Sequence, residues 1–242
     1  MKKKFIFVRR IIKKIIYKEK VDTETYINYL RKIGVTIGNN VEIFFLRDTT
    51  IDITNPFLLE IGSNVSMTGP VCILCHDYSV CVTKKKYNGY ILGKQKKTII
   101  GDNVFLGWGA CVLPGSHIHE NTIIGAYSVV SGSLEPNSVY AGNPAKRISS
   151  IDDFYKRRFD SQLKEAVEIY KSYVKIYNKK PDEKIFHEYF FLFSSEKNGT
   201  LNSLFEKKMY DHGNYEESLL AWKNNNPLFN SFEDFCVYCE KS

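Results

Sequence analysis

The 242-residue sequence lacks any apolar run that approaches the length of about 18 residues at which a membrane-spanning helix is expected. It also lacks the secretory pattern of a short apolar segment followed by a small-residue cleavage site. We therefore expect neither a membrane span nor a signal peptide. Six cysteines without a secretory signal are expected to be reduced thiols in a cytoplasmic protein.

Cysteine pairs with metal-ligand spacing are also few. Two Cys-x-x-Cys pairs, Cys72/Cys75 and Cys236/Cys239, have the spacing of zinc ligands. However, Cys72 and Cys75 lie in an apolar strand context, where side chains three residues apart point to opposite faces. We favour burial of these cysteines as small hydrophobic residues and expect no metal.

Positive charge is concentrated at the beginning of the chain, whose formal net charge is +7. Residues 1–20 hold nine Lys or Arg and one Glu, with apolar residues near helical spacing at Phe5, Val8, Ile12, Ile15 and Ile16. Such a basic amphipathic helix can lie on anionic lipid, which would bring the protein to the inner face of the membrane. The alternative is that its apolar stripe packs on the protein itself. No nucleic-acid-binding motif accompanies the charge, so we expect no nucleic-acid partner.

What the sequence does contain is a six-residue repeat. Apolar residues recur at every sixth position: Ile100, Leu106, Val112, Ile118, Ile124 and Val130. A mostly small residue follows each of them by four positions: Val104, Ala110, Ser116, Thr122, Ser128 and Leu134. A period of six fits neither an amphipathic helix nor a two-faced strand, but it fits a chain that coils around a triangular prism. Three hexads make one coil, and stacked coils pair like parallel strands about 4.8 Å apart.

The repeat begins earlier in the chain and is then interrupted. Apolar residues stand at multiples of six in this part too: Ile37, Ile43, Ile61, Met67 and Ile73. Residues 44–60 are irregular and predict a bulged coil. The phase is lost after Ile73 and returns at Ile100, so residues 77–99, which are polar and rich in lysine, predict a loop that leaves the prism. His76 stands at the base of this loop.

These features together resemble a known family. The hexads, the loop that follows a histidine and the closing segment 141–146 are similar to the hexapeptide-repeat (left-handed β-helix) acyltransferases over residues 34–148. Within that family, the segments 76–79 (His-Asp-Tyr-Ser) and 106–109 (Leu-Gly-Trp-Gly) most resemble the bacterial O-acetyltransferases of capsule and lipopolysaccharide synthesis. The resemblance implies a homotrimer, acetyl-CoA as donor and active sites in the grooves between neighbouring prisms.

We therefore expect a mainly β fold with three parts. Residues 1–33 form a basic amphipathic N-terminal segment, and residues 34–148 form a left-handed parallel β-helix with the loop 77–99. Residues 149–242 form an α-helical C-terminal extension, because the hexads stop there and a helical apolar stripe begins. That stripe consists of Leu163, Val167, Tyr170, Val174 and Tyr177.

His76 is the expected general base. Neutral imidazole titrates near pH 7, and the residue matches the catalytic histidine of the family. We expect direct transfer, in which His76 takes the proton of an acceptor hydroxyl and returns it to the sulfur of CoA. Cys75 and Cys111 are alternative nucleophiles, but no second histidine is placed to activate either. Asp77 could orient His76, yet neighbours in an extended segment face apart, so the orienting group stays open.

The resemblance also implies roles for residues outside the loop. Trp108 carries an outward indole, which would form a wall against acetyl-CoA or the acceptor and offer its backbone N–H to the oxyanion; the alternative is packing between subunits. Ala126 lies 18 residues further on and should stack in the same column. Ser131 and Lys146 are expected to continue this cofactor track.

Two further assignments follow from the resemblance. Lys146, with Arg147 beside it, resembles the family's cationic contact to the CoA phosphates. Asp48 stands where related sugar acetyltransferases place a polar residue that holds the acceptor; the alternative is a solvated turn residue.

The predicted function is acetyl-CoA-dependent O-acetylation of a sugar hydroxyl in a bacterial surface polysaccharide, capsule or O-antigen. N-acetylation of an amino-sugar nucleotide is the alternative within the family. A γ-class carbonic anhydrase shares the prism but needs three histidines around zinc, and His117 and His119 have the wrong spacing for it. A non-catalytic prism is disfavoured by His76 and the predicted cofactor track.

Overall fold

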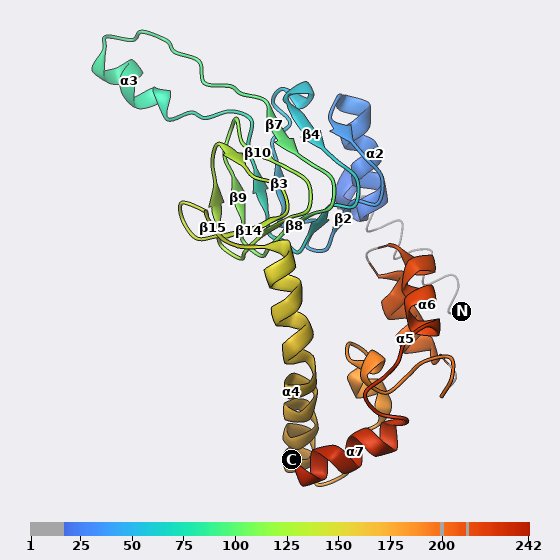
Figure 1. Cartoon of the computed structure of the whole chain (residues 1–242). Coiled ribbons are helices and arrows are strands. Elements are labelled where there is room, and N and C mark those ends of the chain that lie inside the picture. The colour runs from blue at the N-terminus through green and yellow to red at the C-terminus, as the bar shows by residue number, and fades with distance from the viewer. Residues whose placement is uncertain (1–16, 199–200, 212) are drawn as a thin grey trace. The chain divides into compact units, whose positions relative to one another are not determined.

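The computed structural model describes residues 17–198, 201–211 and 213–242. The chain divides into two compact units, Met1–Phe154 and Tyr155–Ser242. The first unit contains the β-strands and the second is helical (Figure 1). Most of the predicted basic N-terminal helix, residues 1–16, lies outside the described residues.

The strands of the described residues form three sheets, which we call faces A, B and C. Face A contains, in spatial order, β1 (Thr36–Ile37), β4 (Leu59–Ile61), β7 (Thr98–Ile100), β10 (His117–Ile118) and β13 (Ser133–Leu134). Face B contains β2 (Glu42–Ile43), β5 (Ser66–Met67), β8 (Val104–Leu106), β11 (Thr122–Ile124), β14 (Ser138–Ala141) and β15 (Lys146–Ser150). Face C contains β3 (Thr50–Ile51), β6 (Cys72–Ile73), β9 (Cys111–Val112) and β12 (Val129–Val130).

The chain visits the faces in the order A, B, C, and each strand pairs in parallel with the strand of the next coil. Only β15, at one end of face B, pairs antiparallel among the described strands. The result is a parallel β-helix with a triangular cross-section. Its turns lie at three edges, which we call the AB, BC and CA corners after the faces that they join.

The hexad residues fill the interior of this prism. The six apolar residues from Ile100 to Val130 are each 0–1% exposed, and the residues four positions later are buried as well. Neighbouring coils align hexad on hexad, as in the pairs Ile118 with Ile100 and Val130 with Val112. The prediction of a prism with 18-residue coils is confirmed in this part of the chain.

The first coil is longer than the 18-residue coils that follow the loop, as the irregular segment 44–60 predicted. Ile43 aligns with Met67 and Ile51 aligns with Ile73, so this coil takes more than 18 residues to close. The extra length lies in the turn after β2 and in the short 3-10 helix η2 (Pro56–Leu58). Helix α2 (Thr23–Ile33), preceded by η1 (Lys18–Val21), packs Tyr26, Ile27 and Leu30 into the same core.

The loop after β6 leaves the prism, as predicted, and carries helix α3 (Val80–Lys86) away from the sheets (Figure 1). The loop ends at residue 97, because β7 begins at Thr98 rather than after residue 99. Its two ends pair with each other. The backbone N–H of Lys96 donates to the carbonyl of Cys75 at 2.9 Å, and that of Asp77 donates to the carbonyl of Lys94 at 3.0 Å. The base of the loop is therefore held firmly next to His76.

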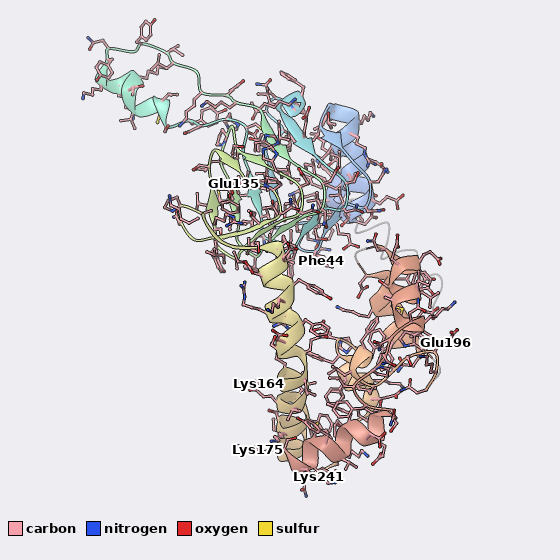
Figure 2. The ribbon with its side chains drawn as sticks, viewed as in Figure 1. Phe44, Glu135, Lys164, Lys175, Glu196 and Lys241 are labelled. Atoms are coloured by element: carbon pink, nitrogen blue, oxygen red, sulfur yellow. The ribbon has the colours of Figure 1, made fainter. Side chains whose placement is uncertain are left out.

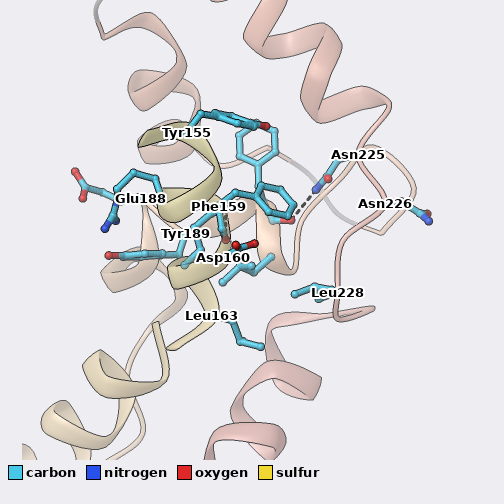
Figure 3. Close-up of a pocket in the computed structure, with 13 residues that line it drawn as sticks. Tyr155, Phe159, Asp160, Leu163, Glu188, Tyr189, Asn225, Asn226 and Leu228 are labelled. Atoms are coloured by element: carbon cyan, nitrogen blue, oxygen red, sulfur yellow. Dashed lines mark hydrogen bonds between the residues drawn. The ribbon is translucent and has the colours of Figure 1, made fainter. Parts of the chain in front are cut away.

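The second unit contains most of α4 (Ile151–Tyr177) and several shorter elements. These are η3 (Glu183–Phe186), η4 (Phe190–Leu192), α5 (Ser203–Tyr210), α6 (Tyr215–Lys223) and α7 (Phe232–Lys241). Its core is aromatic: Phe186, Phe205 and Phe235 are fully or almost fully buried, and the rings of Phe190 and Phe205 stack at 4.6 Å. Polar side chains such as Lys164 and Lys175 are exposed on α4 (Figure 2). A pocket opens beside the N-terminal half of α4 (Figure 3).

No helix among the residues that the structure describes is both long and apolar enough to cross a bilayer.

Candidate active site

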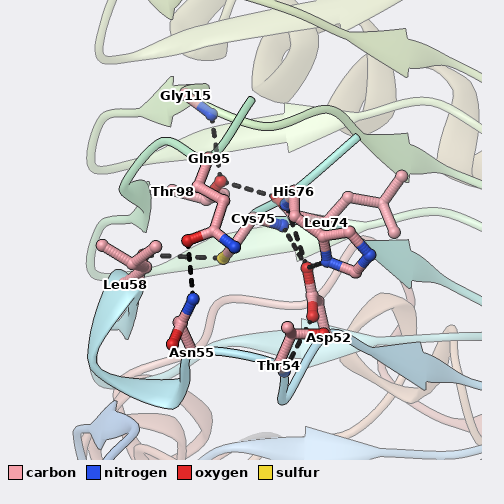
Figure 4. A network of polar contacts seen from close by, with 10 residues as sticks. All are labelled: Asp52, Thr54, Asn55, Leu58, Leu74, Cys75, His76, Gln95, Thr98 and Gly115. Carbon is pink, nitrogen blue, oxygen red and sulfur yellow. Dashed lines mark hydrogen bonds and ion pairs between the residues drawn. The ribbon is translucent and has the colours of Figure 1, made fainter. Parts of the chain in front are cut away.

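The base of the loop holds a histidine and a buried carboxylate in direct contact (Figure 4). His76 Nδ1 meets Asp52 Oδ2, and the same oxygen accepts the backbone N–H groups of Cys75 at 2.8 Å and His76 at 3.0 Å. The other oxygen, Oδ1, accepts the N–H of Thr54 at 3.0 Å. The side chain of Asp52 is 2% exposed, whereas that of His76 is 20% exposed. The buried carboxylate thus fixes the imidazole, while the exposed part of the ring is open to a substrate.

Adjacent coils create this contact. Ile51 of β3 and Ile73 of β6 lie side by side on face C, and both strands end at the CA corner. The N–H of Asp52 donates to the carbonyl of Ile73 at 2.9 Å, which places the carboxylate beneath the turn that carries His76. Asp52 is the orienting group that the sequence left open.

The surroundings of Asp52 keep it ionised. Burial acts to raise the pKa of this carboxyl, but hydrogen bonds from the backbone N–H groups of Thr54 and Cys75 and from the His76 side chain outweigh burial, and the pKa is lowered. An ionised carboxylate can only accept hydrogen bonds, so Nδ1 of His76 must carry the proton. This leaves the lone pair of the neutral ring on Nε2, the atom that a general base requires.

Asp77 does not orient His76, as the strand geometry predicted. Its Oδ1 accepts the N–H of Ser79 at 2.7 Å and its Oδ2 pairs with Lys94 Nζ at 2.5 Å. The ring of Tyr78 instead approaches the His76 ring edge-on, with centroids 4.5 Å apart. Asp77 therefore closes the base of the loop.

Cys75 lies beside the histidine but is a poor nucleophile. Its side chain is buried, and burial raises the pKa of its thiol. Its Sγ lies 3.5 Å from the carbonyl oxygen of Leu58. The structure thus disfavours a covalent route through Cys75.

Trp108 lies at a different edge, the BC corner between β8 and β9. The indole is 38% exposed and packs edge-on against Phe45, with ring centroids 4.4 Å apart. Ala126 lies one coil further along the same corner, where the N–H of its neighbour Tyr127 donates to the carbonyl of Trp108 at 2.7 Å. Trp108 and Ala126 therefore share a column, as their 18-residue spacing predicted.

Asp48 belongs to the same corner. It is exposed in the turn between β2 and β3, where its N–H donates to the carbonyl of Phe45 at 3.2 Å. Phe45 connects this turn to Trp108 through their ring contact. Asp48 is thus on the Trp108 edge of the chain, separated from His76 by face C.

Ser131 lies at the CA corner rather than on the column of Trp108 and Ala126. Val129 aligns with Cys111, so Ser131 continues that register beside Leu113 at the CA corner. The reason is that five residues separate Ser131 from Ala126, a step that crosses face C. Ser131 is exposed on the His76 edge of the prism.

Lys146 and Arg147 lie on β15, which returns antiparallel along β14. Lys146 aligns with Ala141 and its side chain is exposed. Arg147 is partly engaged within the chain, because its Nε donates to Ser138 Oγ at 2.9 Å and lies 3.7 Å from Glu135. Of the two cations, Lys146 is better placed to meet a ligand.

The remaining histidines lie elsewhere. His117 and His119 face outward on both sides of Ile118, with ring centroids 3.7 Å apart, and burial lowers the pKa of His117. His187 lies in the helical unit, and His212 lies outside the described residues. Within residues 17–198, 201–211 and 213–242, no three His, Cys, Asp or Glu side chains are grouped as metal ligands.

Comparison with known proteins supports the family. The repeat described as bacterial transferase hexapeptide (six repeats) matches residues 97–132. Protein CapG of Staphylococcus aureus is 33% identical over 125 residues, which cover 52% of this chain and 71% of CapG. The galactoside O-acetyltransferase of Escherichia coli K12 is 30% identical over 144 residues, covering 60% of this chain and 66% of that protein. The putative lipopolysaccharide biosynthesis O-acetyl transferase WbbJ of the same bacterium is 50% identical over 59 residues, covering 24% of this chain and 30% of WbbJ.

This chain belongs to the hexapeptide-repeat acyltransferases. It is therefore a transferase of acyl groups, and the family resemblance that the hexads predicted is confirmed.

Proposed function

We propose that this protein is an acetyl-CoA-dependent O-acetyltransferase that modifies a sugar hydroxyl of a bacterial surface polysaccharide, capsule or O-antigen. The observation that carries the proposal is the contact of His76 Nδ1 with the buried carboxylate of Asp52. It supplies an oriented base at the foot of an extruded loop on a hexapeptide-repeat prism. The names of two relatives, a galactoside O-acetyltransferase and a putative lipopolysaccharide O-acetyl transferase, support a sugar hydroxyl as acceptor.

The proposed reaction is a direct transfer. His76 Nε2 takes the proton of the acceptor hydroxyl as its oxygen attacks the carbonyl carbon of the thioester. The tetrahedral intermediate collapses by breaking the carbon–sulfur bond, and the imidazolium returns its proton to the departing CoA sulfur. Asp52 does not take the proton; it keeps the ring in one tautomer and stabilises the transient imidazolium.

The donor acetyl-CoA is proposed to lie along the BC corner. Trp108 would form a wall of the channel, and the small side chain of Ala126 leaves room for the pantetheine arm. Lys146, assisted by Arg147, would meet the phosphates at the end of the channel. Ser131, at the CA corner, would contact the donor from the His76 side. Asp48 is proposed to hold the acceptor.

The division of the site between two corners supports a homotrimer. His76 lies at the CA corner and Trp108 at the BC corner, so a groove that contains both requires the CA corner of one prism and the BC corner of its neighbour. A closed ring of three such heterologous contacts makes three equivalent grooves. The left-handed coil that the family resemblance implies is part of this proposal.

We place the reaction in the cytoplasm, with residues 1–20 as the candidate contact with the inner face of the membrane. Their positive charge would favour an anionic lipid surface, where precursors of surface polysaccharides are available to a peripheral enzyme.

The decisive experiment incubates the purified protein and its His76→Ala variant with acetyl-CoA and a panel of sugars, nucleotide sugars and polysaccharides. Release of free CoA thiol reports transfer, and mild alkali distinguishes the product, because O-acetyl esters are cleaved whereas N-acetyl amides survive. We expect an alkali-labile acetyl group on a glycan and no transfer by the variant. An alkali-stable product on an amino-sugar nucleotide would replace the proposal with N-acetylation, and CoA release that never depends on an acceptor would refute it.

A further inference from the structure

The helical unit contains a pocket of about 700 Å³ that the acetyl-transfer proposal does not use (Figure 3). This volume lies within the range of about 300–1,000 Å³ that is usual for small-molecule sites. Three segments line the pocket: the N-terminal half of α4, residues 188–192 and the loop 225–228. All of them belong to the unit Tyr155–Ser242.

Apolar side chains on the wall of the pocket are left uncovered. Tyr155 and Phe159 lie one turn apart on α4, are 67% and 61% exposed, and have ring centroids 6.2 Å apart. Leu228 faces solvent from the opposite loop, at 66% exposed. Large apolar groups that gather in one hollow are typical of a binding site rather than of a free surface. A ligand for this pocket must therefore present an apolar face.

Polar side chains also line the pocket. Asp160 lies beside Phe159 and offers carboxylate oxygens as acceptors (Figure 3). Gln162 donates to the carbonyl of Phe159 at 3.3 Å, which leaves its amide oxygen as a further acceptor. A ligand for this pocket must therefore carry hydroxyl or amide groups as well as an apolar face.

The pocket is preorganised by hydrogen bonds inside the unit. The Asn225 amide donates to the carbonyls of Phe191 at 2.7 Å and Ser194 at 2.9 Å, which fixes the loop to the opposite wall. Tyr189 donates to Glu165 at 3.1 Å, and Arg158 forms two hydrogen bonds to the same carboxylate at 2.7 and 2.6 Å. Walls that are held in place in advance lose little entropy when a ligand binds.

The charges disfavour an anionic ligand. Arg158, the one cationic side chain among the described residues that line the pocket, is already held by Glu165. Glu188 is paired with Lys208 at 3.0 Å, and Asp160 adds a negative charge to the lining. Phosphate groups, and with them CoA or a nucleotide, would meet no unpaired cation among these lining residues.

We propose that this pocket binds a neutral sugar residue of a glycan. A pyranose ring has an apolar C–H face that stacks on aromatic rings, here Tyr155 and Phe159, and hydroxyls around its rim that hydrogen-bond to planar groups such as the carboxylate of Asp160. The inference rests on the proposed function in supposing that the glycan is the acceptor polymer. A second hold on the polymer would raise its effective concentration at the catalytic groove of the same molecule.

The test uses the full-length His76→Ala variant, which binds without turnover, on an array of defined bacterial surface oligosaccharides, neutral and acidic. The double substitution Tyr155→Ala/Phe159→Ala is introduced into this background. Both residues are exposed, so the fold should persist, which circular dichroism and the melting temperature verify. Tyr177→Ala, an exposed aromatic at the other end of α4, is the matched control. The oligosaccharide that binds best on the array is then titrated by calorimetry.

We expect preferential binding of neutral glycans, a loss of affinity of at least 10-fold in the double variant and no change in the control. In the otherwise wild-type enzyme, the double substitution should raise KM for the polymer by about 10-fold and leave KM for acetyl-CoA unchanged. Equal glycan binding by the double variant, or no binding of any glycan to the parent, would overturn the inference. So would a change of oligomeric state in the double variant, because the pocket would then be a protein interface. If binding depends on the pocket but no glycan is acetylated, the inference stands and the proposed function fails.

Discussion

At the residue scale, chemistry at the CA corner depends on the environment of one carboxylate. Asp52 accepts three backbone N–H groups and the imidazole while it is almost entirely buried. The pairing of β3 with β6 brings these donors to the carboxylate, so the fold itself stabilises the negative charge of Asp52. Asp52 orients the His76 ring. Asp77, the acidic neighbour in the loop, does not, because its carboxylate is bonded to Ser79 and Lys94.

Replacing His76 by Ala removes the proposed base and should lower kcat by about 10²- to 10⁴-fold, the usual contribution of general acid–base catalysis. Binding of acetyl-CoA should persist, since the donor channel is placed at the BC corner. His119→Ala, which truncates a half-buried histidine on face A, serves as the control and should keep full activity. Steady-state kinetics and a titration with CoA measure both quantities; turnover near the wild-type rate would remove His76 from the mechanism.

Asp52→Asn preserves the shape of the carboxyl but can donate to Nδ1, which selects the other tautomer of His76. We expect kcat to fall by about 10²- to 10⁴-fold while KM for acetyl-CoA changes little. Partial unfolding would also lower the apparent kcat without changing KM, so kcat is expressed per folded protein, and circular dichroism measures the folded fraction. A kcat that returns to the wild-type value after this normalisation would leave Asp52 a role in the fold alone.

The same substitution predicts a pH signature in stability. The pKa of Asp52 is lowered in the folded protein, so its stabilising contribution is fully present above the unfolded value of about 3.9 and is lost as the pH falls through the folded pKa. The wild type should therefore melt at a higher temperature than Asp52→Asn at neutral pH, and the difference should shrink below about pH 4. A difference that stays constant from pH 7 to pH 3 would contradict an ionised Asp52.

At the element scale, the coils stack so closely at their corners that some positions tolerate no side chain. A Cβ atom on Gly107 would lie 2.7 Å from the backbone nitrogen of Ala126 and 2.8 Å from the carbonyl oxygen of Ile124. Both contacts are with the backbone of the next coil, which cannot rotate away. The glycine after Leu106 in its hexad is thus a requirement of coil spacing.

Gly107→Ala should accordingly destabilise the prism by about 1–3 kcal/mol, the cost of overpacking a well-packed interior. Gly93→Ala in the loop is the control, because nothing lies within 4 Å of its added Cβ, and it should change stability by less than about 0.5 kcal/mol. Denaturant titrations of the three proteins measure this. Equal stabilities would mean that the corner can widen at little cost.

The returning strand β15 brings Lys146 to the end of the proposed donor channel. Lys146→Glu would place a negative charge where the phosphates are expected, so KM for acetyl-CoA should rise by about 10-fold while KM for the acceptor stays constant. Lys175→Glu on α4 makes the same charge change at an exposed position of the helical unit and should alter neither KM (Figure 2). If only the acceptor KM moves, the donor channel is misplaced.

At the scale of the whole molecule, one chain keeps His76 and Trp108 at different corners, with face C between them. Activity therefore depends on assembly if both residues serve one reaction. Sedimentation should give a particle of about 84 kDa, three times the 28.0 kDa chain. A fully active monomer would overturn the shared groove.

Subunit mixing tests the same division more directly. Trimers formed from His76→Ala and Lys146→Glu chains contain some grooves in which both contributing corners are wild type. The two proteins are unfolded and refolded together and assayed at an acetyl-CoA concentration well below KM, where Lys146→Glu alone keeps about one tenth of the wild-type rate. The mixture should then be more active than either protein refolded alone. A mixture that has formed trimers but is no more active than refolded Lys146→Glu would place both residues on the same side of the groove.

The hexads alone predicted the prism, its interior and the extruded loop. Residues such as Leu106, Val112 and Ile124 are buried because a repeat of six places each of them on the inner side of its own face of the prism. The family followed from the same pattern, and His76 was recognisable because it stands where the repeat is interrupted. These are local properties, which a periodic sequence carries in each repeat.

The tertiary structure decided which turns come together. Asp52 was missed because it lies in the irregular first coil, where the length of the coil, and hence the partner of each residue, cannot be counted in hexads. The corner at which Ser131 lies also comes from the register, which places it beside Leu113 at the CA corner. The residues that meet between coils depend on the number of residues in each turn before the next strand pairs. Only the folded register, which sums all of these lengths, brings a carboxylate 24 residues away to Nδ1 of His76.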